Sequence, residues 1–294
     1  MSLIKRGLRH YIGLNFHVSF SLMSLTVLTY FKSDLPVDLF YVAFAGLGTL
    51  AVYTYIKQVP AEATLKSAWR AVTRESPAWV HLISVLALCL VGRFNPSQVV
   101  VLVASIFLSV AYILPWPLLV SSHRRERKST RFAHTLRDFG AIKIIIVALV
   151  WSSVSIVLPL LAYGPISINI VMLFLAQTMW VIVLTIPFEI RDTHKDQLRH
   201  PTWPQKMGLF RVKAIGIVLL IMSLFVQFLR LNFIEQEASH VPSFLDVPYL
   251  FTMGLTAFGL LWAKPNQSFW YSAFWIEAIP IVWLVLSGFN FVIL

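Results

Sequence analysis

The stretch SINIVMLFLAQTMWVIVLTIPFEIRDTHKDQ (residues 167–197) joins a long apolar run to a cluster of charged side chains. Its first 22 residues (167–188) carry no charge, and a helix of that length can cross the hydrocarbon core of a membrane. Glu189, Asp192 and Asp196 follow directly, spaced i, i+3 and i+7. A helix that continues would place these carboxylates on one face. The stretch therefore predicts a membrane-spanning helix that ends in an acidic face at the lipid–water boundary.

The composition of the whole chain agrees with a membrane location. The 294 residues are 58% hydrophobic and 13% charged, with a mean hydropathy of +0.76. A soluble domain is about 45–50% apolar and about 25% charged, so the chain is predicted to be an integral membrane protein. Its single cysteine, Cys89, lies within an apolar run, which excludes a disulfide framework and a cysteine-rich metal site.

Nine apolar stretches are long enough to cross a membrane as helices. Proline, glycine or charged residues separate them, as is typical of the connections between helices. The nine predicted spans are residues 12–31, 38–56, 77–95, 97–119, 141–163, 167–188, 210–232, 245–263 and 269–292. The first follows a basic start but lacks a small-residue cleavage site, so we expect a retained span and not a signal peptide. We predict an all-α integral membrane protein, a nine-transmembrane-helix bundle in one domain over residues 1–294.

The distribution of positive charge predicts the orientation of this bundle. If the nine spans alternate, 21 of the 24 lysines and arginines fall on one side, and the exceptions are Lys32, Arg93 and Arg230. Positive residues concentrate on the cytoplasmic side, so we expect a cytoplasmic N-terminus and a C-terminus outside. The net charge of +11 then reflects topology and not nucleic-acid binding.

The longest predicted loops also lie on the basic side. They follow spans two, four and six and cover residues 57–76, 120–140 and 189–209. A protein that elaborates one membrane face is expected to work at that face. We therefore predict chemistry at the cytoplasmic face of the cell's inner (cytoplasmic) membrane.

The acidic face after residue 188 has two interpretations. It is either a solvated helix end whose charges Arg191 and Lys195 balance, or a divalent-cation site. Mg²⁺ prefers hard oxygen ligands and is often held by one or two carboxylates together with substrate phosphates. Arginine and lysine beside such acids would contact the phosphate oxygens. The spacing alone leaves both interpretations open.

A family resemblance bears on that choice. The segment IPFEIRDTHKD (186–196) resembles the second acidic motif, Asp-x-x-Asp-x-x-x-Asp, of the UbiA-type intramembrane prenyltransferase superfamily, with Glu189 at the place of the first Asp. RDFGAIKIIIVALVW (137–151) and GTLAVYTYIKQ (48–58) resemble a divergent branch of that superfamily. Nine spans with a cytosolic N-terminus also match its fold. The resemblance therefore covers essentially the whole chain and implies a UbiA-like bundle.

The resemblance implies a function and a set of site residues. The function is Mg²⁺-dependent transfer of a prenyl group from a prenyl diphosphate to a small, lipophilic acceptor of aromatic or polycyclic type. The implied metal ligands are Glu189, Asp192, Asp196 and Glu62. The implied diphosphate-binding residues are Arg137, Lys143, Arg191 and Lys57. Catalysis is expected to rest on Asp192, Asp196 and Lys143.

The first acidic motif of the family, Asn-x-x-x-Asp-x-x-x-Asp, is degenerate in this chain. Its positions at the end of the second span are occupied by Thr54, Gln58 and Glu62, so one carboxylate remains. This makes a second Mg²⁺ site doubtful. Lys57, beside the missing ligands, either supplies the charge of one cation or anchors the helix at the interface.

Four polar residues within the spans are candidates for lining an internal cavity: Glu277, Asn15, His17 and Gln177. An ionisable group inside the membrane usually faces a cavity or a partner, and Glu277 lies well inside the last span. The alternatives are a protonated packing acid for Glu277 and interhelical hydrogen bonds for the other three.

Other classes of function remain open beside the transferase. The first is a non-catalytic UbiA-like protein that binds an isoprenoid lipid or a membrane partner. A transporter or channel is less favoured, because only Glu277 is a clear ionisable group at mid-membrane and transporters carry several. A purely structural subunit is the last. The expected partners are a prenyl diphosphate, a lipophilic acceptor and membrane lipids, without nucleic acid.

Overall fold

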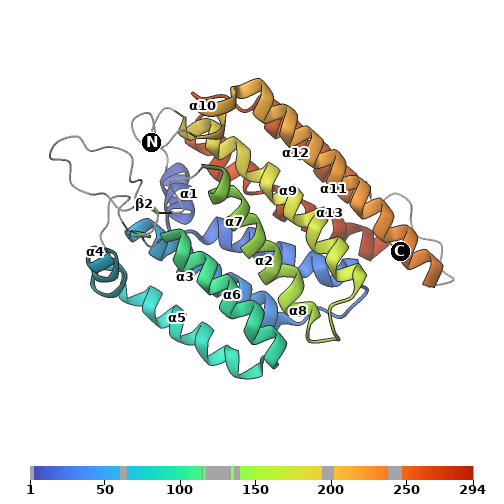
Figure 1. Cartoon of the computed structure of the whole chain (residues 1–294), viewed down its shortest axis with the longest axis horizontal. Coiled ribbons are helices and arrows are strands. Elements are labelled where there is room, and N and C mark those ends of the chain that lie inside the picture. The colour runs from blue at the N-terminus through green and yellow to red at the C-terminus, as the bar shows by residue number, and fades with distance from the viewer. Residues whose placement is uncertain are drawn as a thin grey trace.

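The computed structural model describes residues 3–59, 65–113, 115–116, 134–135, 140–193, 202–237 and 247–293, and nearly all of these are helical (Figure 1). In chain order the helices are α1 (Leu3–Gly13), α2 (Phe16–Lys32), α3 (Leu39–Gln58), α4 (Leu65–Arg70), the π-helix η1 (Ala71–Glu75), α5 (Ala78–Leu90), the 3-10 helix η2 (Val91–Arg93), α6 (Pro96–Ile113), α7 (Gly140–Ser152), the π-helix η5 (Ser153–Val157), α8 (Leu158–Leu160), α9 (Ile168–Asp192), α10 (Trp203–Met207), α11 (Leu209–Glu237), α12 (Val247–Trp262), the π-helix η6 (Tyr271–Ile276) and α13 (Ile279–Ile293). One short antiparallel pair, β1 (Pro115–Trp116) with β2 (His134–Thr135), completes the described elements.

Within these residues, five helical segments are long and apolar enough to cross a membrane: 39–58, 142–160, 168–192, 209–232 and 271–288. Two bent pairs would each make one more span, namely α1 with α2, bent by 65°, and α4–η1 with α5–η2, bent by 93°. The helices α6 and α12 are apolar but shorter. The all-α architecture and the apolar helices are as predicted, and each predicted span overlaps one of these elements. The nine-span count and the orientation of the termini stay predictions.

Helix α9 lies at the centre of the bundle. It contacts α7, α11 and α12, while α2 packs between α3 and α13. In its most apolar window 61% of α9 is buried, against 28% for α11. The outward surface of α11 is apolar, with Val218, Ile221, Met222, Phe225 and Phe228 exposed. An apolar surface of this kind is suited to lipid, so α9 is an internal helix and α11 a peripheral one.

The two ends of the bundle differ in what they carry. The N-terminus, α4 and α10 lie at one end and the C-terminus at the other (Figure 1). At the second end Arg230 on α11 is buried, and its Nε donates to Asn169 Oδ1 (2.5 Å) and its Nη2 to the Lys32 carbonyl (2.6 Å). These bonds join the ends of α11, α9 and α2. The end that carries α10 is where α9 delivers its acidic residues.

Close helix packing at Gly216 gives a prediction about stability. A Cβ at Gly216 would lie 2.5 Å from Leu260 Cδ2 and 3.1 Å from Ile186 Cδ1, and both of these side chains are fully buried. We expect Gly216→Ala to cost about 1–2 kcal/mol through overpacking. The matched control is Gly254→Ala on α12, where nothing lies within 4 Å of the added Cβ. Thermal unfolding in detergent should show a lower midpoint for Gly216→Ala only; equal midpoints would contradict this packing.

Candidate functional site

The acidic end of α9 is a continuation of its apolar run. The helix extends past the predicted boundary at residue 188 and ends at Asp192, so Glu189, Arg191 and Asp192 are helical. The side chain of Ser167 caps the helix start by accepting from the Ile170 amide (3.3 Å). Three residues with predicted roles at this end lie outside the described residues: Asp196, Glu62 and Arg137.

Glu189 and Lys143, both predicted site residues, contact each other. Lys143 Nζ on α7 lies 2.6 Å from Glu189 Oε1 on α9, and their side chains are 26% and 2% exposed. An ion pair with one partner this deeply buried is strongly coupled, because a charge left alone there would lack water to solvate it. A metal-ligand role for Glu189 or a diphosphate-binding role for Lys143 would compete with this pair.

Arg191 joins the end of α9 to the last span. Its Nε and Nη2 donate to the two oxygens of Asp192 (2.8 and 3.2 Å), and its Nη1 donates to Ser272 Oγ on η6 (2.8 Å). The guanidinium also lies 5.3 Å from the centre of the Phe188 ring. Two-point contact with a carboxylate is the strong geometry of arginine. Asp192 is 20% exposed, so a cation arriving from solvent can reach this carboxylate.

The turn between α1 and α2 closes the same end of the bundle. Lys57 Nζ, in the last turn of α3, donates to the Gly13 carbonyl (3.1 Å). Asn15, in the left-handed conformation (φ 67°), donates from Nδ2 to Thr54 Oγ1 (3.1 Å). The amide of Asn15 therefore lies beside Thr54, the first of the three positions at which the resemblance predicts a degenerate acidic motif.

His17 on α2 contacts η6, the π-helix that ends next to Glu277. Lys57 and Arg191 both lie within electrostatic range of the Glu277 carboxylate. His17 Nε2 lies 2.9 Å from the Phe274 carbonyl, so this nitrogen donates, and Nδ1 is then placed to accept from the Tyr11 hydroxyl at 3.2 Å. The predicted cavity residues Glu277, Asn15 and His17 therefore lie near Lys57 at one end of the bundle, and His17 has the interhelical bonds that one interpretation anticipated.

The donor set at this end suits Mg²⁺ in part. Carboxylate oxygen is the ligand that Mg²⁺ prefers, and Asp192 is a partly exposed carboxylate. Glu189 is buried against Lys143. In the described part of the chain no group of three His, Cys, Asp or Glu side chains is close enough to hold a metal ion. Asp192 can supply one carboxylate ligand to the ion, and the remaining protein ligands would come from the predicted residues Asp196 and Glu62.

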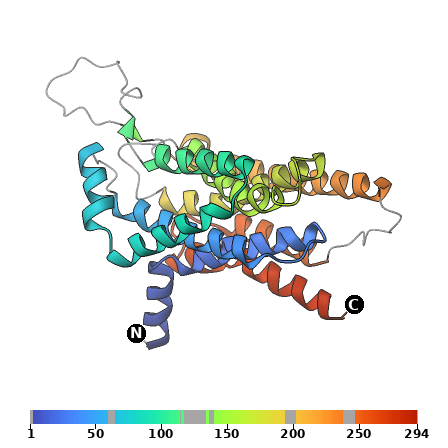
Figure 2. The same ribbon diagram turned by 90° about the horizontal axis from the view of Figure 1, so that it is seen from below.

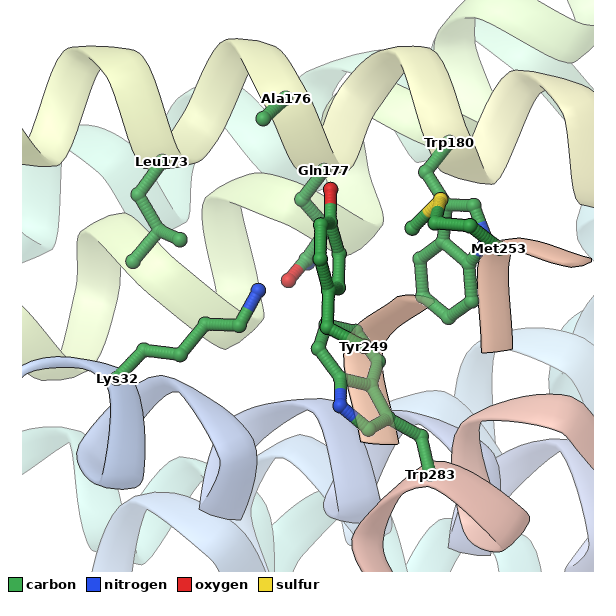
Figure 3. A pocket seen from close by; sticks show the side chains of 8 residues that line it. All are labelled: Lys32, Leu173, Ala176, Gln177, Trp180, Tyr249, Met253 and Trp283. Atoms are coloured by element: carbon green, nitrogen blue, oxygen red, sulfur yellow. The ribbon is translucent and has the colours of Figure 1, made fainter. Parts of the chain in front are cut away.

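Gln177 lies in a different place from the acids. It lines a small pocket between α2, α9, α12 and α13, together with Lys32, Tyr249 and Trp283 (Figure 3). Lys32 Nζ sits 4.2 Å from the centre of the Tyr249 ring and 4.1 Å from that of Trp283. Along α9, Gln177 precedes Asp192 by about 22 Å at ~1.5 Å per residue. The pocket is therefore separate from the acidic end, and Gln177 Nε2 donates to Ser155 Oγ (2.6 Å) within the bundle.

The structure also adds residues that the sequence did not single out. Ser272 accepts from Arg191, and Tyr11 contacts His17. Tyr53, beside Thr54 on α3, accepts from Trp151 Nε1 (3.2 Å). Serine and tyrosine are ordinary residues in apolar helices, so no spacing or charge pattern marked them.

Comparison with known proteins connects this arrangement to a known fold. No family model and no curated protein matches the sequence. Solved structures of UbiA homologs do match the chain. The apo structure of a UbiA homolog from Aeropyrum pernix K1 has a TM-score of 0.59 and 12% identity, covering 94% of this chain and 98% of that one. A UbiA homolog from Archaeoglobus fulgidus bound to DMAPP and Mg²⁺ has a TM-score of 0.50 and 13% identity, covering 98% of both chains. At this identity the likeness shows that the chain has the UbiA fold over nearly its whole length.

Proposed function

We propose that this integral membrane protein binds a prenyl diphosphate with Mg²⁺ at the acidic end of α9 and transfers the prenyl group to a lipophilic acceptor within the bundle. We further propose that this end faces the cytoplasm and that residues 1–294 act as one domain. The UbiA fold supports the proposal, because one structure with that fold is bound to DMAPP and Mg²⁺. The acceptor would be a small aromatic or polycyclic compound.

The observation that carries the proposal is the mixed charge at one end of the bundle. Asp192 offers carboxylate oxygens there, while Arg191, its neighbour on α9, and Lys57, in the last turn of α3, offer cationic donors. Carboxylates that hold a metal ion, beside cations that contact phosphate oxygens, form the arrangement that a metal–diphosphate complex requires. A site with acids alone would repel the diphosphate, and a site with bases alone would not retain Mg²⁺.

The proposed residues act on the leaving diphosphate. The step breaks the bond between the prenyl carbon and a diphosphate oxygen, and the electron pair leaves with the diphosphate. Bound Mg²⁺, held by Asp192, Asp196 and Glu62, would supply Lewis-acid neutralisation of that charge. Arg191, Lys57 and Arg137 would donate to the diphosphate oxygens, a stabilisation that grows as charge develops. The acceptor then forms a bond to the allylic cation and releases a proton. A site closed to bulk water would prevent capture of the cation by hydroxide or water.

The two ion pairs favour a second candidate function. Glu189 is paired with Lys143, and Asp192 with Arg191, so these acids already have cationic partners within the chain. A protein that uses them to fasten helix ends would bind an isoprenoid lipid or a membrane partner without Mg²⁺ and without catalysis.

Binding of geranylgeranyl diphosphate to the detergent-purified protein separates the two candidates. With Mg²⁺ we expect saturable binding, and with EDTA we expect binding to be lost, because the diphosphate would then face the acids without a bridging cation. Geranylgeraniol, which lacks the diphosphate, is the matched control ligand. Binding that is the same with and without Mg²⁺, or that geranylgeraniol reproduces, would rule out the diphosphate site and support the non-catalytic candidate.

A further inference from the structure

Helix α1 is amphipathic along its whole length. Ile4, Leu8 and Tyr11 follow the spacing i, i+4 and i+7 and form one apolar stripe. The basic residues Lys5, Arg6, Arg9 and His10 lie around the other side of the helix. Ile4 is 75% exposed, so the start of the apolar stripe is not covered by the described residues of the bundle. An apolar stripe with basic residues on the opposite face is typical of a helix that lies in a membrane interface.

The direction of α1 fits that interpretation. Figure 2 shows α1 (dark blue, beside the N-terminus) projecting from the side of the bundle at a steep angle to the long helices. The bend between α1 and α2 is 65°. A helix that leaves the end region of a membrane bundle sideways would lie over lipid, at the depth of the headgroups.

Contacts at the turn hold α1 in this direction. Asn15 has the left-handed backbone conformation that breaks the helix and donates to Thr54 on α3. The Gly13 carbonyl accepts from Lys57, and the Tyr11 hydroxyl bonds to His17. Three contacts to two other helices define the direction of α1 without any contribution from lipid.

A second helical segment at the same end also exposes a large apolar side chain together with basic residues. The α4–η1 segment turns 93° from α5 and packs Ala68 and Ala71 against Val59. Its outer surface carries Trp69, which is 69% exposed, with Lys66, Arg70 and Arg74, which are also exposed. Tryptophan is enriched at the membrane interface, and basic residues there attract anionic headgroups.

We propose that α1, together with α4–η1 at the same end of the bundle, is an interfacial segment that binds the anionic lipid surface of the leaflet at the acidic end. The apolar stripe would rest on the acyl-chain boundary while the basic residues contact headgroup phosphates. Each basic residue near such a surface strengthens binding by roughly fivefold. The occupant is the lipid surface, because an uncovered apolar stripe flanked by positive charge complements lipid of negative charge.

Spin labelling in lipid nanodiscs tests this proposal. In a Cys89→Ser background, which removes the single cysteine, a label is attached at Ile4→Cys or at Arg6→Cys, on opposite faces of α1. In discs that contain phosphatidylglycerol we expect the label at position 4 to be reached by oxygen and shielded from a water-soluble nickel relaxant. The label at position 6 should show the reverse. Equal access of nickel to both positions would show that α1 projects into water and would overturn the proposal.

The role of lipid charge is tested with the label at position 4. We expect the shielded fraction of the label to be lower in discs made of phosphatidylcholine alone. In anionic discs it should also be lower when Lys5→Gln and Arg6→Gln are combined, because each lost charge weakens the docking equilibrium by roughly fivefold. The matched control is Lys206→Gln with Arg211→Gln, which removes two exposed positive charges from α10 and α11. If shielding of the label is the same in neutral and anionic discs and is unchanged by the two substitutions, α1 does not bind anionic lipid.

Discussion

Replacing Asp192 with asparagine is expected to weaken Mg²⁺-dependent binding of geranylgeranyl diphosphate at least about 100-fold. Mutating residues that only hydrogen-bond to metal ligands already lowers metal affinity by about 10–100-fold. Asp192 is the partly exposed carboxylate at the end of α9, and the change removes its negative charge while keeping its size. Asp196→Asn is expected to have an effect of the same order. The measurement is a titration of the detergent-purified protein with the diphosphate at saturating Mg²⁺ and again with EDTA.

The control for this prediction is Asp34→Asn. Asp34 is exposed and lies just beyond the end of α2, at the end of the bundle away from the acids, and asparagine tolerates its positive φ of 53°. The change removes the same charge from the chain, so it corrects for any effect of net charge on anion binding. Unchanged binding in Asp192→Asn and Asp196→Asn would show that the acids do not hold the metal. A weakening in Asp34→Asn as large as theirs would show that the effect is not local.

The sequence predicted the helical framework because membrane spans are encoded locally. The apolar run 167–188 and the acids after it predicted a helix that continues into the acidic residues, and α9 does so, ending at Asp192. Within the described residues the other predicted spans also overlap apolar helices. The bends were not predicted. They depend on contacts between distant segments, such as that between Lys57 and the Gly13 carbonyl, which no local pattern contains.

The sequence singled out individual candidate residues but not how they lie relative to one another. The sequence marked Lys143 and Glu189 separately, as a diphosphate-binding residue and a metal ligand, but the structure pairs them. It marked Glu277 as a buried acid, and the structure shows that Lys57 and Arg191 are its electrostatic neighbours. Ser272 was missed because a single hydroxyl in an apolar helix has no signature. Charge and hydropathy identify residues that need a partner, whereas the choice of partner depends on how α3, α7, α9 and η6 pack.

The pairing of Lys143 with Glu189 predicts a large effect on stability. Lys143→Met keeps most of the apolar stem but removes the ammonium from a carboxylate that is 2% exposed. Removing one member of a buried ion pair costs about 3–5 kcal/mol, and we expect a value near 3 kcal/mol because Lys143 is 26% exposed. The free energy of unfolding in detergent or a lowered thermal midpoint would measure it. Lys206→Met, which removes an exposed lysine from α10, should leave both unchanged.

A double-mutant cycle distinguishes this ion pair from a site that needs only Lys143. Combining Lys143→Met with Glu189→Gln leaves no formal charge in the pair, so the double variant should recover most of the stability that Lys143→Met loses. If Lys143 instead acted on the diphosphate and contributed nothing to Glu189, the two changes would simply add. The same variants separate folding from binding. Restored stability with diphosphate binding still lost would mean that Lys143 or Glu189 serves the ligand as well as the helix end, while restored stability with normal binding would confine both to the junction between α7 and α9.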